Sequence, residues 1–175
     1  MNIFVLDKNP ITAARMMDCV RVPKMVTESA QMMASALRRH GATDEQMPLT
    51  KSGTPYKGGY KHHPCTIFAG DSYANFMWLA DHALELCNEY FQRFGKVHAC
   101  HYPINFMRDM NIIDKVITKG KLTPFAQAMP DEYKDEDAVK AYRAYYKSKV
   151  DSPGGVHYRH TSPPDWWMYN EELTI

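Results

Sequence analysis

Residues 71–95 read DSYANFMWLADHALELCNEYFQRFG, and this stretch decides the fold. Asp71 or Ser72 can cap a helix at its start and Gly95 can end it, which gives a helix of about 23 residues. Apolar side chains recur along the stretch at spacings of three and four residues, as on the buried face of a helix. They are Tyr73, Phe76, Ala80, Ala83, Cys87, Tyr90 and Phe94. The stretch therefore predicts the central helix of the core.

Further helices are predicted on both sides of this one. Asn9 followed by Pro10 is a helix start signal, for a helix that runs to about Asp18. Pro23 cannot sit in the interior of a helix without breaking a hydrogen bond. We therefore expect a break at residues 19–22 and a second helix from Pro23 to about His40. Comparable patterns predict helices over residues 106–118 and 135–150.

These patterns predict a mainly α protein. We expect a single compact domain over residues 1–175, of about five helices with a short extended N-terminal segment at residues 2–6. Residues 41–59 are rich in Gly, Pro, Thr and Ser and are expected to form a flexible loop. Residues 151–175 are expected to form an irregular C-terminal tail that packs on the body.

Composition narrows the class of protein. A hydrophobic content of 45% with 23% charged residues is that of a globular domain. No apolar run approaches the roughly 20 residues that a membrane span requires, and the start lacks the pattern of a signal peptide. The four cysteines are scattered, which favours reduced thiols. We expect a cytoplasmic protein without membrane contact.

Charge is unevenly placed although the net charge is only +1. A dedicated nucleic-acid-binding domain usually has a pI above about 9, whereas this chain has a pI of about 7.7. Between residues 46 and 70, however, there are three lysines, two histidines and no acidic residue. This local excess permits phosphate binding without requiring it.

A polar stripe interrupts the apolar sequence of residues 18–31. Arg21, Lys24, Glu28 and Gln31 fall at i, i+3, i+7 and i+10, on one side of a helix. Asp18 precedes them, and Pro23 leaves Asp18 and Arg21 at the joint between two helices. Because buried charges are costly unless they are paired, the stripe is either a salt-bridged seam or a functional site.

Two further groups of polar residues flank the predicted central helix. Lys61, His62 and His63 precede it, and Arg93, Lys96 and His98 lie at or after its end. Each group can approach an anion. Neither has a recognised zinc spacing, so no metal is predicted. The sequence has no P-loop, GxGxxG, GxSxG or HExxH motif, and no cofactor is expected.

Several segments resemble a group of uncharacterised proteins of tailed phages. The resembling segments are MNIFVLD (1–7), VPKMVTESAQMM (22–33), HHPCTIFA (62–69), FGKVHA (94–99), TPFAQAMP (123–130) and AVKAYRAYY (138–146). The resemblance implies a phage origin, and hence the cytoplasm of the host cell as the location.

A second resemblance covers about the first 100 residues. It rests on Arg21-Val22-Pro23-Lys24, on Tyr60-Lys61-His62-His63-Pro64 before the long helix, and on Glu89-x3-Arg93-x-Gly95 at its end. These features resemble the pyrimidine-dimer DNA glycosylases of the endonuclease V type. The resemblance implies base flipping and cleavage of a glycosidic bond, with the N-terminal α-amine as the nucleophile that forms a Schiff base, assisted by a Glu and by Arg residues.

The chain departs from that family's pattern at three positions. When the sequences are aligned on Pro23, the family's catalytic Glu falls at Arg21, which cannot act as a base. Lys24 replaces an Arg and keeps only the charge. Asn2 replaces a Thr, and its larger side chain favours retention of Met1, whose amine would then be the nucleophile. The hypothesis is that Glu28, one turn beyond Lys24, stands in for the missing carboxylate.

Two functions follow as hypotheses. The first is a phage enzyme of DNA or nucleotide metabolism, glycosylase/lyase-like, with Met1, Lys24 and Glu28 as catalytic residues. Its expected substrate-binding residues are Asp18, Arg21, Gln31, Lys61, His62, His63, Arg93, Lys96 and His98. The alternative is a non-catalytic phage accessory protein that binds a host protein or a nucleotide, for which twelve methionines and many aromatic residues are suited.

Overall fold

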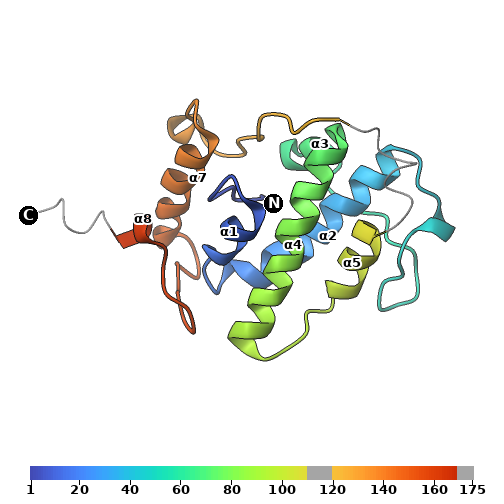
Figure 1. Cartoon of the computed structure of the whole chain (residues 1–175), viewed down its shortest axis with the longest axis horizontal. Helices are drawn as coiled ribbons and strands as arrows, with labels where there is room; N and C mark the ends of the chain where they lie inside the picture. Colours follow the sequence, from blue (N-terminus) through green and yellow to red (C-terminus); the bar gives the residue numbers. More distant parts are fainter. Residues whose placement is uncertain (110–119, 169–175) are drawn as a thin grey trace, which may run out of the picture.

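A computed structural model describes residues 1–109 and 120–168. Its centre is α4 (Tyr73–Phe94), which runs through the middle of the molecule in Figure 1. The Ser72 hydroxyl caps it by accepting from the N–H of Asn75, and Gly95 ends it in the left-handed region at φ 67°. The expectation from residues 71–95 is confirmed at both ends.

Four helices pack against α4. They are α1 (Pro10–Arg15), α2 (Arg21–Arg39), α3 (Pro64–Asp71) and α5 (His101–Asp109). The α2 helix crosses α4 in Figure 1. Two more helices, α7 (Ala138–Lys147) and α8 (Asp165–Met168), lie at the left-hand end of the molecule in Figure 1, away from α5. Three short 3-10 turns complete the described elements: Asp44–Gln46, Asp131–Tyr133 and Ser148–Asp151.

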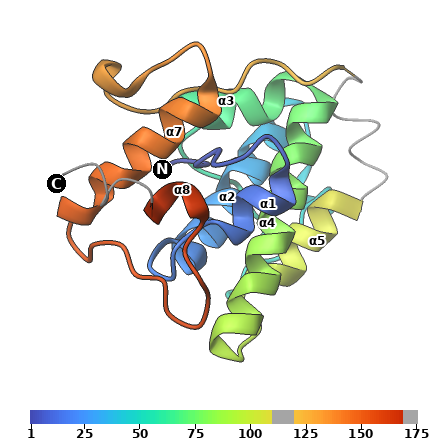
Figure 2. The same cartoon turned by 60° about the vertical axis from the view of Figure 1, so that its left-hand side comes forward.

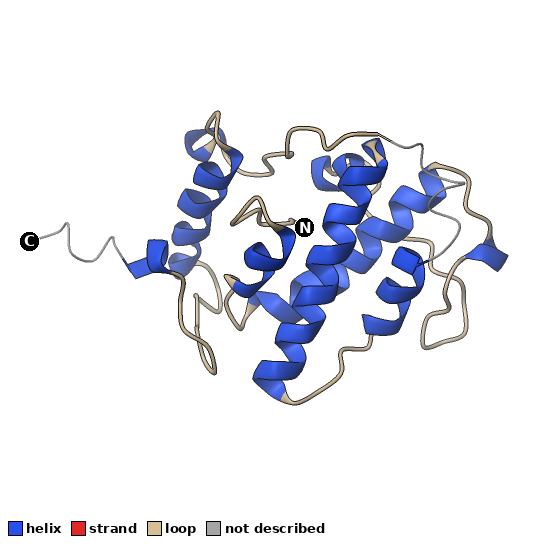
Figure 3. Cartoon of the chain, viewed as in Figure 1, coloured by secondary structure: helices blue, strands red, loops and turns tan. Residues whose placement is uncertain are grey.

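The mainly α fold class is confirmed, and the protein is a single compact domain. Figure 3 shows helices and loops only, with no strand in the ranges that the structure describes. Two helices, α3 and α8, add to the five that the sequence predicts. None of the helices in the described ranges is both long and apolar enough to cross a membrane.

Two helices begin earlier than predicted, and each has a proline in its first turn. The α2 helix begins at Arg21, so that Pro23 lies in its first turn. The α5 helix likewise begins at His101, before the predicted start at residue 106, with Pro103 in its first turn. Backbone N–H groups in a first turn have no partner within the helix, so a proline there costs no hydrogen bond. The remainder of the predicted 106–118 helix, from residue 110 on, lies outside the described residues.

The N-terminal segment is irregular and buried. Residues 2–6 have side chains that are almost fully enclosed. The side chain of Asn2 accepts from the N–H groups of Ile3 and Phe4, and Phe4 takes a positive φ of 53°. The Phe4 ring packs edge-on against Tyr146 of α7 at 5.3 Å. Figure 2 shows the N-terminus beside α7, so residues far apart in the sequence share one core.

The C-terminal segment contacts the joint between α1 and α2. The Tyr158 hydroxyl donates to the carbonyl of Met16, and the indole of Trp166 lies 3.4 Å from the Met16 sulfur. The N–H of Cys19 donates to the carbonyl of His157 at 2.8 Å. Residues 151–168 therefore lie against the body, whereas residues 169–175 of the predicted tail are outside the described range.

Candidate active site

The N-terminal amine lies beside a carboxylate from α2. The Met1 nitrogen is 3.8 Å from Oε2 of Glu28, and the backbone N–H of Asn2 donates to the same oxygen at 3.1 Å. The other oxygen, Oε1, lies 4.0 Å from Nζ of Lys24, one turn earlier on α2. The Glu28 side chain is 14% exposed and that of Lys24 65%. Met1, Lys24 and Glu28, the three expected catalytic residues, thus meet in space.

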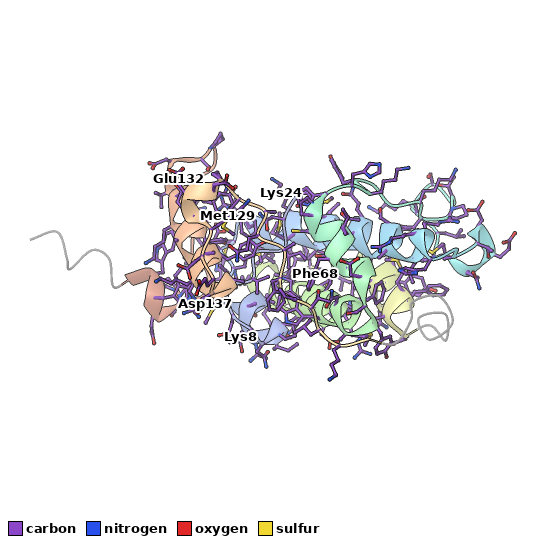
Figure 4. The ribbon with its side chains drawn as sticks, turned by 90° about the horizontal axis from the view of Figure 1, so that it is seen from above. Lys8, Lys24, Phe68, Met129, Glu132 and Asp137 are labelled. Atoms are coloured by element: carbon purple, nitrogen blue, oxygen red, sulfur yellow. The ribbon has the colours of Figure 1, made fainter. Side chains whose placement is uncertain are left out.

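Contacts from distant parts of the chain hold the amine in this position. The Asn2 side-chain amide donates to the carbonyl of Ala128 at 2.8 Å. The Met1 side chain is buried, and the Thr66 hydroxyl of α3 lies 3.5 Å from its sulfur. Figure 4 labels Lys24 and Met129, the neighbour of Ala128, both in its upper half. The amine is therefore fixed by α2, α3 and the 123–130 segment together.

His63 is the fourth group near the amine. Its Nδ1 accepts from the N–H of Cys65 at 3.1 Å and so caps α3. Burial lowers the pKa of His63, the positive charge of the N-terminus lowers it further, and Glu28 opposes this shift. Because Nδ1 is an acceptor, the neutral ring carries its proton on Nε2, where it can donate but cannot act as a base.

Cys65 lies behind this cluster but is not a nucleophile at neutral pH. Burial raises the pKa of the Cys65 thiol to about 11. The Tyr142 hydroxyl lies 3.9 Å from the sulfur, and it accepts from the N–H of Ala128 at 3.3 Å. Burial also raises the pKa of Tyr142. Both groups therefore stay neutral and serve to position the 123–130 segment.

A basic cavity of about 580 Å³ lies near the Met1 side chain, to which it is linked by Thr66. Its lining includes Thr66, the residue that contacts Met1, together with Lys61 and His62. Two arginines of α2, Arg38 and Arg39, also line it. Of the expected substrate-binding residues, Lys61 and His62 line this cavity, and His63 lies near the amine.

Asp18 and Arg21 lie apart from this cluster in a buried network. Asp18 is fully buried and accepts from the Tyr146 hydroxyl, from Arg21 at 3.2 Å and from the N–H of His157 at 3.0 Å. Arg21 also donates to the carbonyl of Gly155 at 2.9 Å. Burial raises the pKa of Tyr146 far above its usual value. Internal partners occupy both charged groups, and the network joins the α1–α2 joint to α7 and the C-terminal segment.

The residues at the far end of α4 also have internal partners. Arg93 is buried and donates to the carbonyl of Met17 at 2.6 Å and to Glu89 at 2.8 Å. The His98 ring lies 3.1 Å from the carbonyl of Pro23, and burial lowers the pKa of His98. Lys96 is exposed beside them, whereas Gln31 is half-buried on α2, in the turn after Glu28. Within the described ranges, none of these four residues forms a hydrogen bond or ion pair with the Met1 amine or with Glu28.

The sequence analysis assigned no positioning role to several residues that build the site. Asn2, Thr66 and Ala128 position the amine through contacts between segments far apart in the chain, which have no local sequence signal. Arg38 and Arg39 at the end of α2 were recognisable only as a basic pair at a helix C-terminus. Within residues 1–109 and 120–168, no group of three or more potential metal ligands occurs.

A helical domain whose terminal amine faces a carboxylate beside a basic cavity has the components of an amine-nucleophile enzyme that acts on an anionic substrate. Residues 1–102 match the family model for pyrimidine dimer DNA glycosylase, and the chain belongs to this family. The family supports a DNA glycosylase-like function and DNA as the substrate class. Searches of curated proteins and of solved structures gave no match.

Proposed function

We propose that the protein is a DNA glycosylase/lyase whose nucleophile is the α-amine of Met1, in a chain that begins at this residue. The single observation that carries the proposal is the position of the amine, 3.8 Å from Oε2 of Glu28. An amine nucleophile requires a neighbouring group that takes up its proton. Glu28 supplies this group from α2, on a helix rather than on a loop.

The proposed reaction begins at C1′ of a deoxyribose. The lone pair of the Met1 amine attacks C1′, the C1′–N glycosidic bond breaks, and its electron pair leaves with the base, which takes a proton from water. The new ammonium gives a proton to the Glu28 carboxylate. Glu28 then protonates O4′ as the C1′–O4′ bond opens, which leaves an iminium ion between Met1 and C1′.

Lys24 and His63 have supporting roles in this proposal. Lys24 is 65% exposed, so its ammonium can reach both Glu28 and a DNA phosphate. The Lys24 side chain is also a second amine near the Glu28 carboxylate. Locating the covalent adduct on the chain tells whether Met1 or Lys24 is the nucleophile. His63 is neutral at pH 7 because its pKa is lowered, so it can donate from Nε2 without adding charge beside the amine.

The test is borohydride trapping on a duplex with an abasic site. Reduction of the iminium ion creates a stable covalent adduct, which peptide mass spectrometry can locate. We expect the adduct on the peptide that starts at Met1. An adduct on Lys24, or none at any lesion while the protein stays folded, would contradict the proposal.

The phage origin, the host-cell cytoplasm and a host-protein partner remain predictions from the sequence. The accessory-protein hypothesis would gain support if Lys24→Ala and Glu28→Gln both left binding of a host partner unchanged. The amine–carboxylate pair favours the enzyme.

A further inference from the structure

The basic cavity near the Met1 side chain has a wall built from one loop. Lys57, Lys61 and His62 line it from residues 57–62, opposite Arg38 and Arg39 of α2. Among the described residues that line the cavity, none carries a carboxylate. The cavity therefore offers positive charge on two sides, which suits an anion.

This loop is held in place by a tight contact with α2. The Ser35 hydroxyl donates to the carbonyl of Gly59 at 2.8 Å and accepts from the N–H of Gly59 at 2.8 Å. Gly58 has a positive φ of 81°, and a Cβ atom there would lie 2.3 Å from the Ser35 hydroxyl and 2.5 Å from its backbone nitrogen. The loop is thus seated on the helix before any ligand binds.

The cations on the two sides of the cavity differ in their partners. Arg38 pairs with Asp44 at 2.6 Å, and Arg39 pairs with Asp71 at 3.0 Å. Across residues 1–109 and 120–168, by contrast, Lys57, Lys61 and His62 have no ion pair or side-chain hydrogen bond. The lysines on the loop are therefore available to an external anion.

Tyr60 is the unusual residue of this loop. It takes a positive φ of 55°, which costs energy for a residue with a bulky side chain. Its side chain is nevertheless 65% exposed, and no aromatic partner for it occurs in the described part of the chain. Neither core packing nor backbone preference explains a tyrosine here. An exposed aromatic ring between two lysines is what stacking on a nucleic-acid base requires.

We propose that the loop of residues 57–62 and its cavity bind one nucleotide of a DNA strand, with the phosphate at Lys57 and Lys61 and the base stacked on Tyr60. The inference rests on the proposed function for the identity of the strand as DNA. Thr66 lines the cavity and contacts the Met1 sulfur, so a strand held there is bound on the side of the molecule that carries Met1. Tyr60 is then a positioning residue, because it acts on the substrate away from the reacting C1′ atom.

Binding is measured with the full chain carrying Glu28→Gln, so that any reaction with the probe is slowed. The probes are inorganic phosphate, thymidine monophosphate and an oligothymidylate of about six nucleotides. We expect Tyr60→Asn to weaken binding of the oligonucleotide by about fivefold or more, the lower end of the loss of one base stack. Lys61→Gln should lower the salt dependence of log K by about 0.7, the contribution of one phosphate contact on a single strand.

Two comparisons separate a positioning role from a structural one. Asparagine tolerates positive φ, so Tyr60→Asn should leave the melting temperature unchanged or raise it while binding falls. Tyr102→Asn removes a tyrosine that is 69% exposed on α5, and it should change neither the melting temperature nor the affinity for the oligonucleotide. Thymidine monophosphate should compete with the oligonucleotide better than phosphate does, because only the nucleotide carries a base.

The results distinguish this inference from the proposed function. Unchanged oligonucleotide affinity in Tyr60→Asn and an unchanged salt dependence in Lys61→Gln would overturn the inference, as would equal competition by phosphate and nucleotide. A fall in melting temperature of Tyr60→Asn that accounts for its loss of binding would also overturn it. Tyr60-dependent binding without any borohydride adduct in the wild type would uphold the inference and reject the enzymatic proposal.

Discussion

The backbone N–H of Asn2 donates to Oε2 of Glu28, so the oxygen that faces the Met1 amine also fixes the first peptide bond of the chain. A glutamine at position 28 can still accept this hydrogen bond through its amide oxygen, but it cannot take up a proton. The structural and chemical roles of Glu28 can therefore be separated by one substitution.

We predict that Glu28→Gln lowers the rate of adduct formation by about 10²–10⁴-fold, the usual contribution of a general base. The melting temperature should change little, because the hydrogen bond from Asn2 is kept. Single-turnover trapping and thermal denaturation measure the two effects. Glu45→Gln, in the exposed 3-10 turn of residues 44–46, is the matched control. A variant that retains the wild-type trapping rate would remove Glu28 from the mechanism.

Extension of the chain by a few residues before Met1 should abolish trapping. The extension converts the amine beside Glu28 into an amide, which is not a nucleophile, whereas the buried Met1 side chain can keep its contact with Thr66. The same residues added after Ile175 should leave the trapping rate unchanged. Equal adduct yields from the two extended proteins would show that the nucleophile is another amine.

Asp18→Asn should destabilise the protein by about 3 kcal/mol, as expected when one partner of a buried ion pair is removed. Both oxygens of Asp18 accept hydrogen bonds, from Tyr146 and Arg21 on one side and from backbone N–H groups on the other. The NH₂ group of asparagine would face donors on either side. Urea denaturation measures the loss, and Asp44→Asn, at a side chain that is 58% exposed, should cost less than about 1 kcal/mol. Equal losses of stability in both variants would contradict a special contribution of the buried Asp18 network to the free energy of unfolding.

Stability should fall as the pH is lowered from about 6.5 to about 4. Burial lowers the pKa of His82 to about 4, so in this range the unfolded chain binds a proton that the folded protein does not. The free energy of unfolding should decrease by about 3 kcal/mol for His82 and level off below its folded pKa. His63 and His98, whose pKa values are also lowered, act in the same direction.

The contribution of His82 is isolated by His82→Gln, whose amide can still donate to the carbonyl of Pro10. Urea denaturation at a series of pH values should give a shallower dependence for this variant than for the wild type. The same pH dependence in both proteins would mean that other groups cause the loss.

Gly58→Ala and Gly53→Ala form a matched pair, since both glycines have φ of 81°. At Gly53 nothing lies within 4 Å of the added Cβ, so only the backbone preference is lost, about 1 kcal/mol. At Gly58 the Cβ would overlap with Ser35, which should cost about 2 kcal/mol more and displace the loop. We expect weaker binding of the oligonucleotide for Gly58→Ala alone. Equal stability and equal binding in the two variants would contradict the tight contact between loop and helix.

Local signals predicted most of the fold. Ser72 and Gly95 bound the central helix as expected, because caps act within one turn. The α3 helix escaped prediction because its eight residues show no amphipathic pattern. His63 and Pro64 mark its start, and packing against α2 and α4 adds to its stability.

Only the part of the site that lies on one helix was predictable from the sequence. Lys24 and Glu28 are neighbours on one helix, and their spacing alone places them together. The contact of Asn2 with Ala128 joins residues 126 positions apart and depends on how α7 folds back on the N-terminus. No local pattern encodes such a contact.

The contact of Asn2 with Ala128 also shows that the site depends on residues beyond the family match. The family match ends at residue 102, yet Tyr142 and Tyr146 are fully buried against Phe4, and Ala128 holds the residue next to the amine. The region that matches the family model is thus smaller than the unit that must fold to assemble the site. A fragment cut at the edge of the match would keep the proposed reactive groups and lose the support that fixes them.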